Sequence, residues 1–245
     1  MEQAGDGSSE QRKGEKARQE SSPPALVLVH SSEDSFKNNP VAERLKESDT
    51  TLLREPEPFV GRDLWQADVV LLGASDPPNL FGRREMNRAV QFVRSGGGLV
   101  VLSTRSPRSR KAREQGMPVR RLLPAFGLGS PGGSLRVSSQ APKGTPKDVL
   151  LCSPASAHPI VRGLQKVAFP EGSSPLALRG SGAPLLVTHR FVKGARGGPP
   201  YLLAAALQHG DGRVVVFSRK PSTDSAGPQG IAATVRAVLW AADRR

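Results

Sequence analysis

Three short runs of apolar residues constrain the fold more than any other feature of this sequence. They are ALVLVH at residues 25–30, ADVVLL at residues 67–72 and LVVL at residues 99–102. A strand that is apolar at nearly every position is buried on both faces, which is typical of a parallel sheet covered by other layers. We therefore predict an α/β domain in which these three strands lie side by side.

The segment between the second and third runs predicts a helix. Four apolar residues recur at helical spacing over residues 82–95, with arginines off that stripe, which indicates an amphipathic helix. The Ser-Gly-Gly-Gly turn at residues 95–98 ends it. A strand, a helix and a strand with short connections indicate parallel strands joined by right-handed crossovers. The predicted buried stripe is Met86, Ala89, Val90 and Val93.

The rest of the chain adds shorter elements to this framework. We expect a helix over residues 231–242 that packs on the sheet, and a hairpin turn at residues 209–212 (HGDG). The expected fold is a three-layer αβα sandwich with a mainly parallel central sheet. Further strands are predicted at residues 50–53, 134–138, 148–152, 184–187, 201–207 and 213–217, and a short helix at residues 120–126.

Residues 1–24 differ in composition from everything that follows. They hold no aliphatic side chain larger than alanine except Met1, and they end in Ser-Ser-Pro-Pro. Such a segment cannot bury enough apolar surface to offset its chain entropy. We therefore expect a disordered tail at residues 1–24 and one domain at residues 25–245.

The net charge of +13 comes from the expected domain, which carries +14, because residues 1–24 hold four basic and five acidic side chains and sum to −1. A basic surface favours acidic partners, whether protein, nucleic acid or anionic membrane. No apolar run approaches the roughly 18 residues that a membrane-spanning helix needs. No apolar stretch precedes Ala25, so we expect no secretory signal.

Cysteine and histidine usage limits the chemistry. Cys152 is the single cysteine, which excludes an intrachain disulfide and a multi-cysteine metal site. The four histidines show no metal-ligand spacing. We therefore expect a cytoplasmic protein without a metal or another cofactor.

Several segments, in this order along the chain, resemble the class I glutamine amidotransferase-like superfamily. The resemblance is to a branch without catalytic residues, which includes domains of an intraflagellar-transport subunit, of gliding-motility transporter-associated proteins and of uncharacterised bacterial proteins. It implies a flavodoxin-like fold over residues 25–243 and a protein-interaction or scaffold role. The segments are WQADVVLLG (65–73), NRAVQFVRSGGGLVVL (87–102), RLLPAFGL (121–128), AHPIVRGL (157–164), GRVVVF (212–217) and VLWAA (238–242).

Catalytic members of that superfamily need a cysteine on a strained turn directly after a strand, flanked by glycines. They also need a late His-x-Glu pair that forms and orients the thiolate. Here Ser103 follows the strand at residues 99–102 without a glycine on either side, and neither His189 nor His209 begins a His-x-Glu motif. Cys152 ends a different strand, and we interpret it as a small core residue. We assign no catalytic residue and expect no enzyme.

An alternative is a hydrolase or small-ligand-binding protein that uses Ser103 or His158. A serine nucleophile would need His30, His158 or His189 as its base, and no orienting acid stands at a recognisable spacing. The structural interpretation of His158 is that it caps a turn that precedes core residues. A polar run beginning at Ser222 could hold an anion or simply cap the last helix. The candidate ligand or loop site is Ser103, Thr104, His158 and Ser222.

Residues 105–121 form the most basic segment, with seven cations against Glu114. Such a segment is either a solvated loop or a site for an acidic partner. Nucleic-acid binding is a second alternative, although no aromatic residue is interleaved to stack on bases. The candidate acidic-partner patch is Arg105, Arg108, Arg110, Lys111, Arg113, Arg120 and Arg121.

Overall fold

A computed structural model describes most of the predicted domain. Of the expected tail it describes Pro24, so that prediction lies almost wholly outside the described residues. The described residues are 24–30, 39–48, 50–55, 62–72, 80–81, 83–102, 117–118, 121–144, 146, 148–189, 191–194, 198–222 and 228–242.

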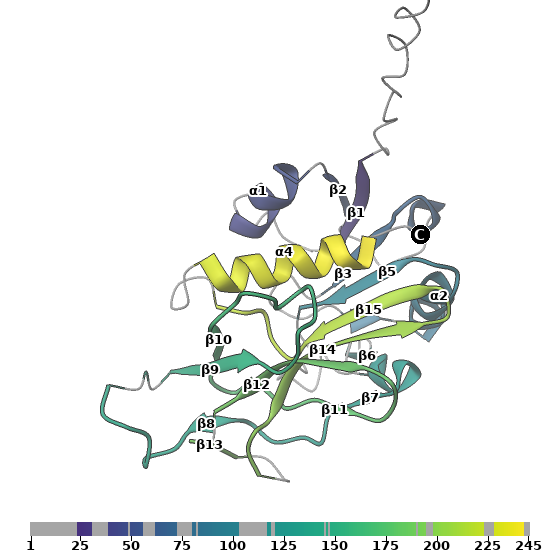
Figure 1. Cartoon of the computed structure of the whole chain (residues 1–245). Helices are drawn as coiled ribbons and strands as arrows, with labels where there is room; N and C mark the ends of the chain where they lie inside the picture. The colour runs from purple at the N-terminus through teal and green to yellow at the C-terminus, as the bar shows by residue number, and fades with distance from the viewer. Residues whose placement is uncertain are drawn as a thin grey trace, which may run out of the picture.

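Within these residues the chain is built on a nine-stranded sheet in the order β10-β9-β12-β14-β15-β5-β3-β1-β2 (Figure 1). The three apolar runs form the adjacent strands β1, β3 and β5, as predicted, and they pair in parallel. β2 and β15 extend this parallel block on its two sides. The block consists of β2 (Thr50–Glu55), β1 (Ala25–His30), β3 (Val69–Leu72), β5 (Gly98–Val101) and β15 (Gly212–Phe217).

The other four strands form an antiparallel block, of which the sequence predicted the hairpin between residues 201–207 and 213–217 but not the pairing order of the outer strands. β14 (Leu202–His209) joins β15 through the two-residue turn Gly210-Asp211, and so short a connection can only link antiparallel strands. β12, β9 and β10 continue the antiparallel pairing outward. The chain is thus a mixed α/β protein in which five of the nine strands pair in parallel with one another. The outer strands are β12 (Ala183–Thr188), β9 (Val149–Pro154) and β10 (Val167–Pro170).

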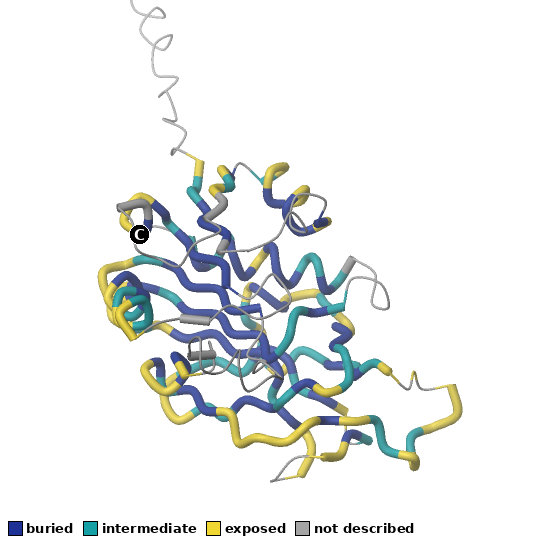
Figure 2. The backbone as a smooth tube through the Cα atoms, turned by 180° about the vertical axis from the view of Figure 1, so that it is seen from behind, coloured by how far each residue is buried: buried dark blue, intermediate teal, exposed yellow. Residues whose placement is uncertain are grey.

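Helices lie on both faces of the parallel block. α4 (Pro228–Ala242) and α1 (Pro40–Lys46) pack on one face, and α2 (Arg83–Arg94) packs on the other (Figure 1). Successive strand residues point to opposite faces. In β3, Val69 and Leu71 join the core beneath α4, whereas Val70 and Leu72 join the core beneath α2. The buried strands form the dark centre of Figure 2.

The buried face of α2 differs in part from the predicted stripe. Ala89 and Val93 are buried as expected, and so is Phe92, which the spacing argument left out. Met86 and Val90 are partly buried against the same core. Two 3₁₀ turns, η2 (Arg62–Trp65) and η4 (Leu123–Phe126), contribute to this face; η4 lies inside the predicted short helix at residues 120–126.

The helix α1 was missed because its seven residues are too few to show a clear helical period. Its start is well defined in the structure. The Asn39 side chain accepts a hydrogen bond from the Val41 N–H at 3.0 Å, and Pro40 begins the helix. In the part of the chain that the structure describes, three two-stranded ladders lie outside the main sheet: β4 (Leu80–Phe81) with β6 (Met117–Pro118), β7 (Leu128–Gly129) with β11 (Ala177–Leu178), and β8 (Arg136–Val137) with β13 (Val192–Lys193).

Candidate functional site

The carboxyl ends of β1, β3 and β5 meet at one edge of the parallel block, where open α/β sheets bind their ligands. The residues that follow these three strands, 31–38, 73–79 and 103–116, lie outside the described residues. Ser103 and Thr104, proposed for the loop site, belong to this group. Of the seven basic residues in the candidate patch, Arg121 is described, and it is exposed. The other six lie outside the described residues.

His158 lies at the opposite, amino-terminal edge of the block. Its ring contacts the Trp240 ring edge to face, with centroids 4.8 Å apart. Trp240 in turn accepts a hydrogen bond from Arg213, and Arg213 pairs with Gly98 at the start of β5. The strand from Gly98 to Leu102 spans about 13 Å at 3.3 Å per residue. His158 and the chain beyond Leu102 are therefore at opposite ends of the strand.

The backbone around His158 shows what this side chain does in the fold. Its Nδ1 accepts a hydrogen bond from the Ile160 N–H at 3.3 Å, and its carbonyl oxygen accepts from Val161 and Arg162. Ile160 and Val161 are fully buried beneath the turn. This is the turn cap weighed in the sequence analysis, and it positions the chain along α4.

The environment of His158 disfavours its charged form. Partial burial lowers the pKa of His158 below its ordinary value of 6.5, and the nearby Arg213 guanidinium lowers it further. A neutral imidazole can act as a base. However, Nδ1 already accepts the Ile160 N–H, so only Nε2 remains for chemistry.

His189 follows β12, the third strand from β5 in the sheet order. Three strand spacings of about 4.8 Å separate it laterally from β5 by roughly 14 Å. The described histidines at positions 158 and 189 are therefore not gathered beside the end of β5. The side chain of His30 lies outside the described residues.

Cys152 is a core residue, as the sequence analysis proposed. It is completely buried in β9, and its thiol contacts the Leu150 carbonyl oxygen at 3.8 Å. Burial raises the pKa of the thiol far above its ordinary value, so the thiolate does not form near neutral pH. A nucleophilic cysteine needs the opposite, a partly exposed thiol beside a positive charge.

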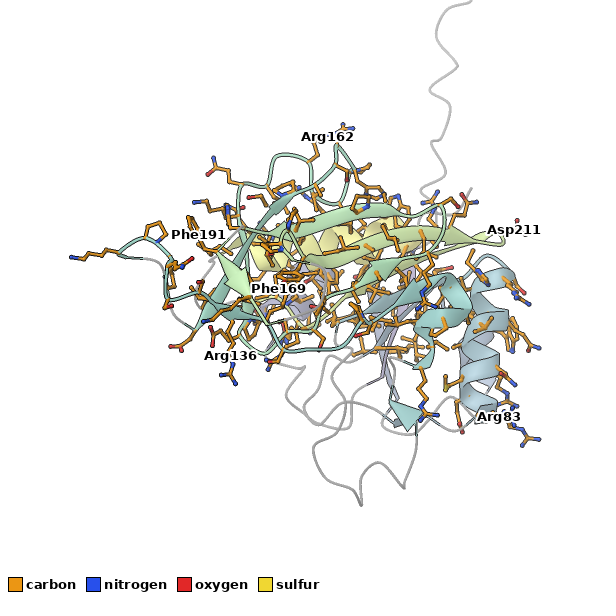
Figure 3. All side chains as sticks on the ribbon, turned by 90° about the horizontal axis from the view of Figure 1, so that it is seen from below. Arg83, Arg136, Arg162, Phe169, Phe191 and Asp211 are labelled. Atoms are coloured by element: carbon orange, nitrogen blue, oxygen red, sulfur yellow. The ribbon has the colours of Figure 1, made fainter. Side chains whose placement is uncertain are left out.

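The two glycine-rich turns, at residues 95–98 and 209–212, pack against each other. The β14–β15 hairpin, with Asp211 at its tip, lies against the end of α2 (Figure 3). A Cβ atom on Gly212 would overlap the carbonyl oxygens of Val93 and Gly97, and Gly210 adopts φ +63° beside the Arg94 carbonyl. His209 accepts a hydrogen bond from the Arg94 Nε at 3.1 Å. The HGDG segment is therefore structural.

A groove that includes none of the predicted site residues opens beside this hairpin. Its volume is about 510 Å³, and it runs between η2, the end of α2 and the end of α4. Trp65 forms one wall with 58% of its surface exposed, and its ring lies edge-on to Phe92, with centroids 6.4 Å apart. The sequence signal for this groove was a tryptophan close to the polar residues Gln66 and Asp68. The groove is also lined by Asp68, Gly96, Gly97, Asp211 and Arg213.

Ser222 is half-buried, and its N–H donates to the Ala168 carbonyl at 2.8 Å. This bond ties the chain ahead of α4 to β10, while residues 223–227 lie outside the described residues. Anion binding by Ser222 stays a prediction.

Among the residues that the structure describes, no group of three or more His, Cys, Asp or Glu side chains could hold a metal ion. Nor does any described helix have the length and apolar character needed to cross a membrane.

Comparison with known proteins gives structural matches but no sequence matches. No family model matches the chain, and no curated protein matches it. The N-terminal domain of mmIFT52 superposes with a TM-score of 0.64 at 16% identity, covering 90% of this chain and all of that one.

Two further solved structures share the same arrangement. A ThuA-like protein from Parabacteroides merdae has a TM-score of 0.54 at 14% identity, covering 90% of both chains. A GMP synthase-like protein from Thermoplasma acidophilum has a TM-score of 0.52 at 10% identity, covering 89% of this chain and 94% of that one. At these identities the likeness defines the fold and no activity. The chain therefore has the class I amidotransferase-like fold.

Proposed function

We propose that this chain is a non-enzymatic amidotransferase-like domain that acts as a protein-interaction or scaffold module. The observation that carries the proposal is the complete burial of Cys152 inside β9. The only thiol of the chain is thereby removed from any substrate and kept protonated. A glutaminase of this fold depends on an exposed thiolate nucleophile.

The other residues that catalysis would need are absent from the sequence or lie far apart in the structure. No His-x-Glu pair occurs at His189 or His209, and no glycine flanks Ser103. His158 lies at the amino-terminal edge of the sheet with Nδ1 already engaged. We infer a complete three-layer αβα arrangement from the helices on both faces, with the layers serving as a frame for surface contacts.

A basic module of this kind suits acidic protein partners and a cytoplasmic location, which the single reduced cysteine also favours. The exposed Trp65 beside the groove supports protein interaction, because tryptophan is enriched among the residues that dominate binding energy. For nucleic-acid binding through residues 105–121, Arg121 is the one basic residue that the structure describes, and the segment contains no aromatic residue.

Activity measurements test the proposal directly. Purified full-length protein is incubated with glutamine, simple amides and esters beside the Ser103→Ala variant. We expect no turnover above background for either protein, because the sequence lacks the glycine-flanked cysteine nucleophile and the His-x-Glu pair that would activate it. Turnover that disappears in Ser103→Ala would replace the scaffold role with a hydrolase.

A further inference from the structure

The outward face of α2 concentrates positive charge on one side of the molecule. Arg83, Arg84 and Arg94 are exposed, and Arg88 is half-buried between them along the helix. The only acid of α2 is Glu85, whose Oε2 atom is buried away from solvent. The helix therefore carries four arginines against one acidic residue, which is half-buried. Figure 3 shows side chains reaching outward along α2 from Arg83 toward the Asp211 hairpin.

The opposite face of the sheet has a different charge pattern. On α1, Arg44 forms an ion pair with Glu47 at 2.5 Å, and Glu43 lies in the same helix. On α1 the two cations Arg44 and Lys46 are thus balanced in number by Glu43 and Glu47. The excess positive charge of the described helices is concentrated on α2. An acidic partner can therefore distinguish the α2 face of the molecule from the opposite face.

An apolar anchor adjoins the arginine face. Trp65 packs edge-on against Phe92, which is a buried residue of α2, and keeps 58% of its surface exposed. It borders the groove of about 510 Å³ that begins where α2 ends. Arginine and tryptophan are among the residue types most enriched at the energetic centres of protein interfaces.

We propose that Trp65, its groove and the arginine face of α2 form one docking surface for an acidic amphipathic segment of a partner protein. The inference rests on the proposed function and specifies the partner. The exposed polar residues Arg84, Gln91 and Arg94 follow one stripe of a helix about 18 Å long, so a partner helix can lie beside it. Its carboxylates pair with the arginines, and an apolar side chain packs on Trp65.

A protein segment fits this surface better than a nucleic acid. Single strands are held by successive aromatic platforms on which bases stack. In the described part of this face, Trp65 is the only large aromatic side chain that is exposed. The groove beside it is lined by the acidic residues Asp68 and Asp211, so it suits the apolar side chain of a protein segment, whose carboxylates lie on the arginine face of α2 instead.

The test measures binding of a labelled peptide to the full chain by fluorescence anisotropy at about 150 mM salt. The probe is an alanine-based helical peptide of about 15 residues, with glutamates along one stripe and leucines beside them. Reference probes are the same peptide with lysines in place of glutamates and an oligothymidylate of about 15 nucleotides.

Two pairs of charge-reversing substitutions distinguish the effect of charge on α2 from the effect of the net charge of the protein. Arg83→Glu with Arg84→Glu reverses two exposed charges in the first turn of α2, where acidic residues favour the helix, so folding is preserved. Arg162→Glu with Lys166→Glu makes the same charge change at exposed positions along α4. We expect the first pair to weaken binding about tenfold or more, and the second pair by less than about threefold.

Trp65 supplies an independent readout. Trp65→Ala should weaken binding about tenfold, while Trp65→Phe should retain most of it. Equal losses in the two charge-reversal pairs would overturn the docking surface, as would an unaffected Trp65→Ala. Binding that is absent, or no weaker for the lysine peptide or oligothymidylate, would also overturn it. These outcomes concern peptide binding alone. Failure of the proposed scaffold role would instead appear as enzymatic turnover, so the two failures can be distinguished.

Discussion

The Nη1 atom of Arg213 donates a hydrogen bond of 2.7 Å to the carbonyl oxygen of Trp240, and its guanidinium carbon lies 5.1 Å from the centroid of the Trp240 ring. The carbonyl belongs to the last turn of α4, which ends at Ala242. Carbonyls in that turn have no partner within their own helix. One side chain thus joins the start of β15 to the end of the helix that covers it.

Replacing Arg213 by methionine should lower the free energy of unfolding by about 1.5–3 kcal/mol, the range for a hydrogen bond to a charged group. Urea denaturation measures the change. Arg236→Met is the matched control, because Arg236 Nη1 donates to the Arg162 carbonyl at 2.7 Å but is exposed. We expect the control to lose less than about 1 kcal/mol. Equal losses would show that burial does not strengthen the Arg213 contact.

Gly212→Ala should destabilise the fold by about 3 kcal/mol or more, because overpacking against backbone cannot be relieved by rotating a side chain. The added Cβ would overlap the carbonyl oxygens of Val93 and Gly97. Gly180→Ala is the control, since its Cβ would meet nothing within 4 Å and its φ is not positive. Thermal unfolding should separate the two variants. A Gly212→Ala protein as stable as Gly180→Ala would refute the close approach of hairpin and helix.

Stability should fall as the pH is lowered from about 7 toward 5. The pKa of His158 is lowered by burial and then by Arg213, and the pKa of His209 is lowered by burial and then by Arg94. A lowered native pKa means that the unfolded chain binds more protons, so this contribution is complete above the unfolded value of about 6.5 and is lost below it.

The His158→Gln variant should show a shallower loss of stability over that pH range, because its side chain does not titrate. Chemical denaturation at a series of pH values measures the slope, and a nuclear magnetic resonance titration follows His158 directly. In the Arg213→Met protein the pKa of His158 should rise, since one cause of the lowering is removed. An unchanged titration curve would contradict the contact with Arg213.

The Cys152 thiol should resist alkylation by iodoacetamide at pH 8 in the native protein and react fully in urea. Complete burial blocks the reagent, and the raised pKa of the thiol leaves little thiolate. Mass spectrometry of the labelled protein measures the extent. Rapid native labelling would place the thiol within reach of substrates and would weaken the non-enzymatic proposal.

Some of this fold follows from local sequence. The runs that became β1, β3 and β5 are apolar at nearly every position, and only strands covered on both faces tolerate that pattern. The helix α2 showed its period over 12 residues, although Phe92 was left out of its buried stripe. The absence of a glycine-flanked cysteine after β5 is likewise a local property, and it can be read directly from Ser103.

Tertiary structure decided the features that depend on partners distant in sequence. The order of the strands in the antiparallel block, the stacking of His158 on Trp240 and the depth at which Cys152 lies all depend on which elements pack together. Trp65 and α2 form one surface only because η2 packs beside that helix. Periodicity and composition specify the type of an element, because they act between residues a few positions apart. Which helices and strands pack together depends on the apolar surface buried over the whole chain, and no single segment encodes that.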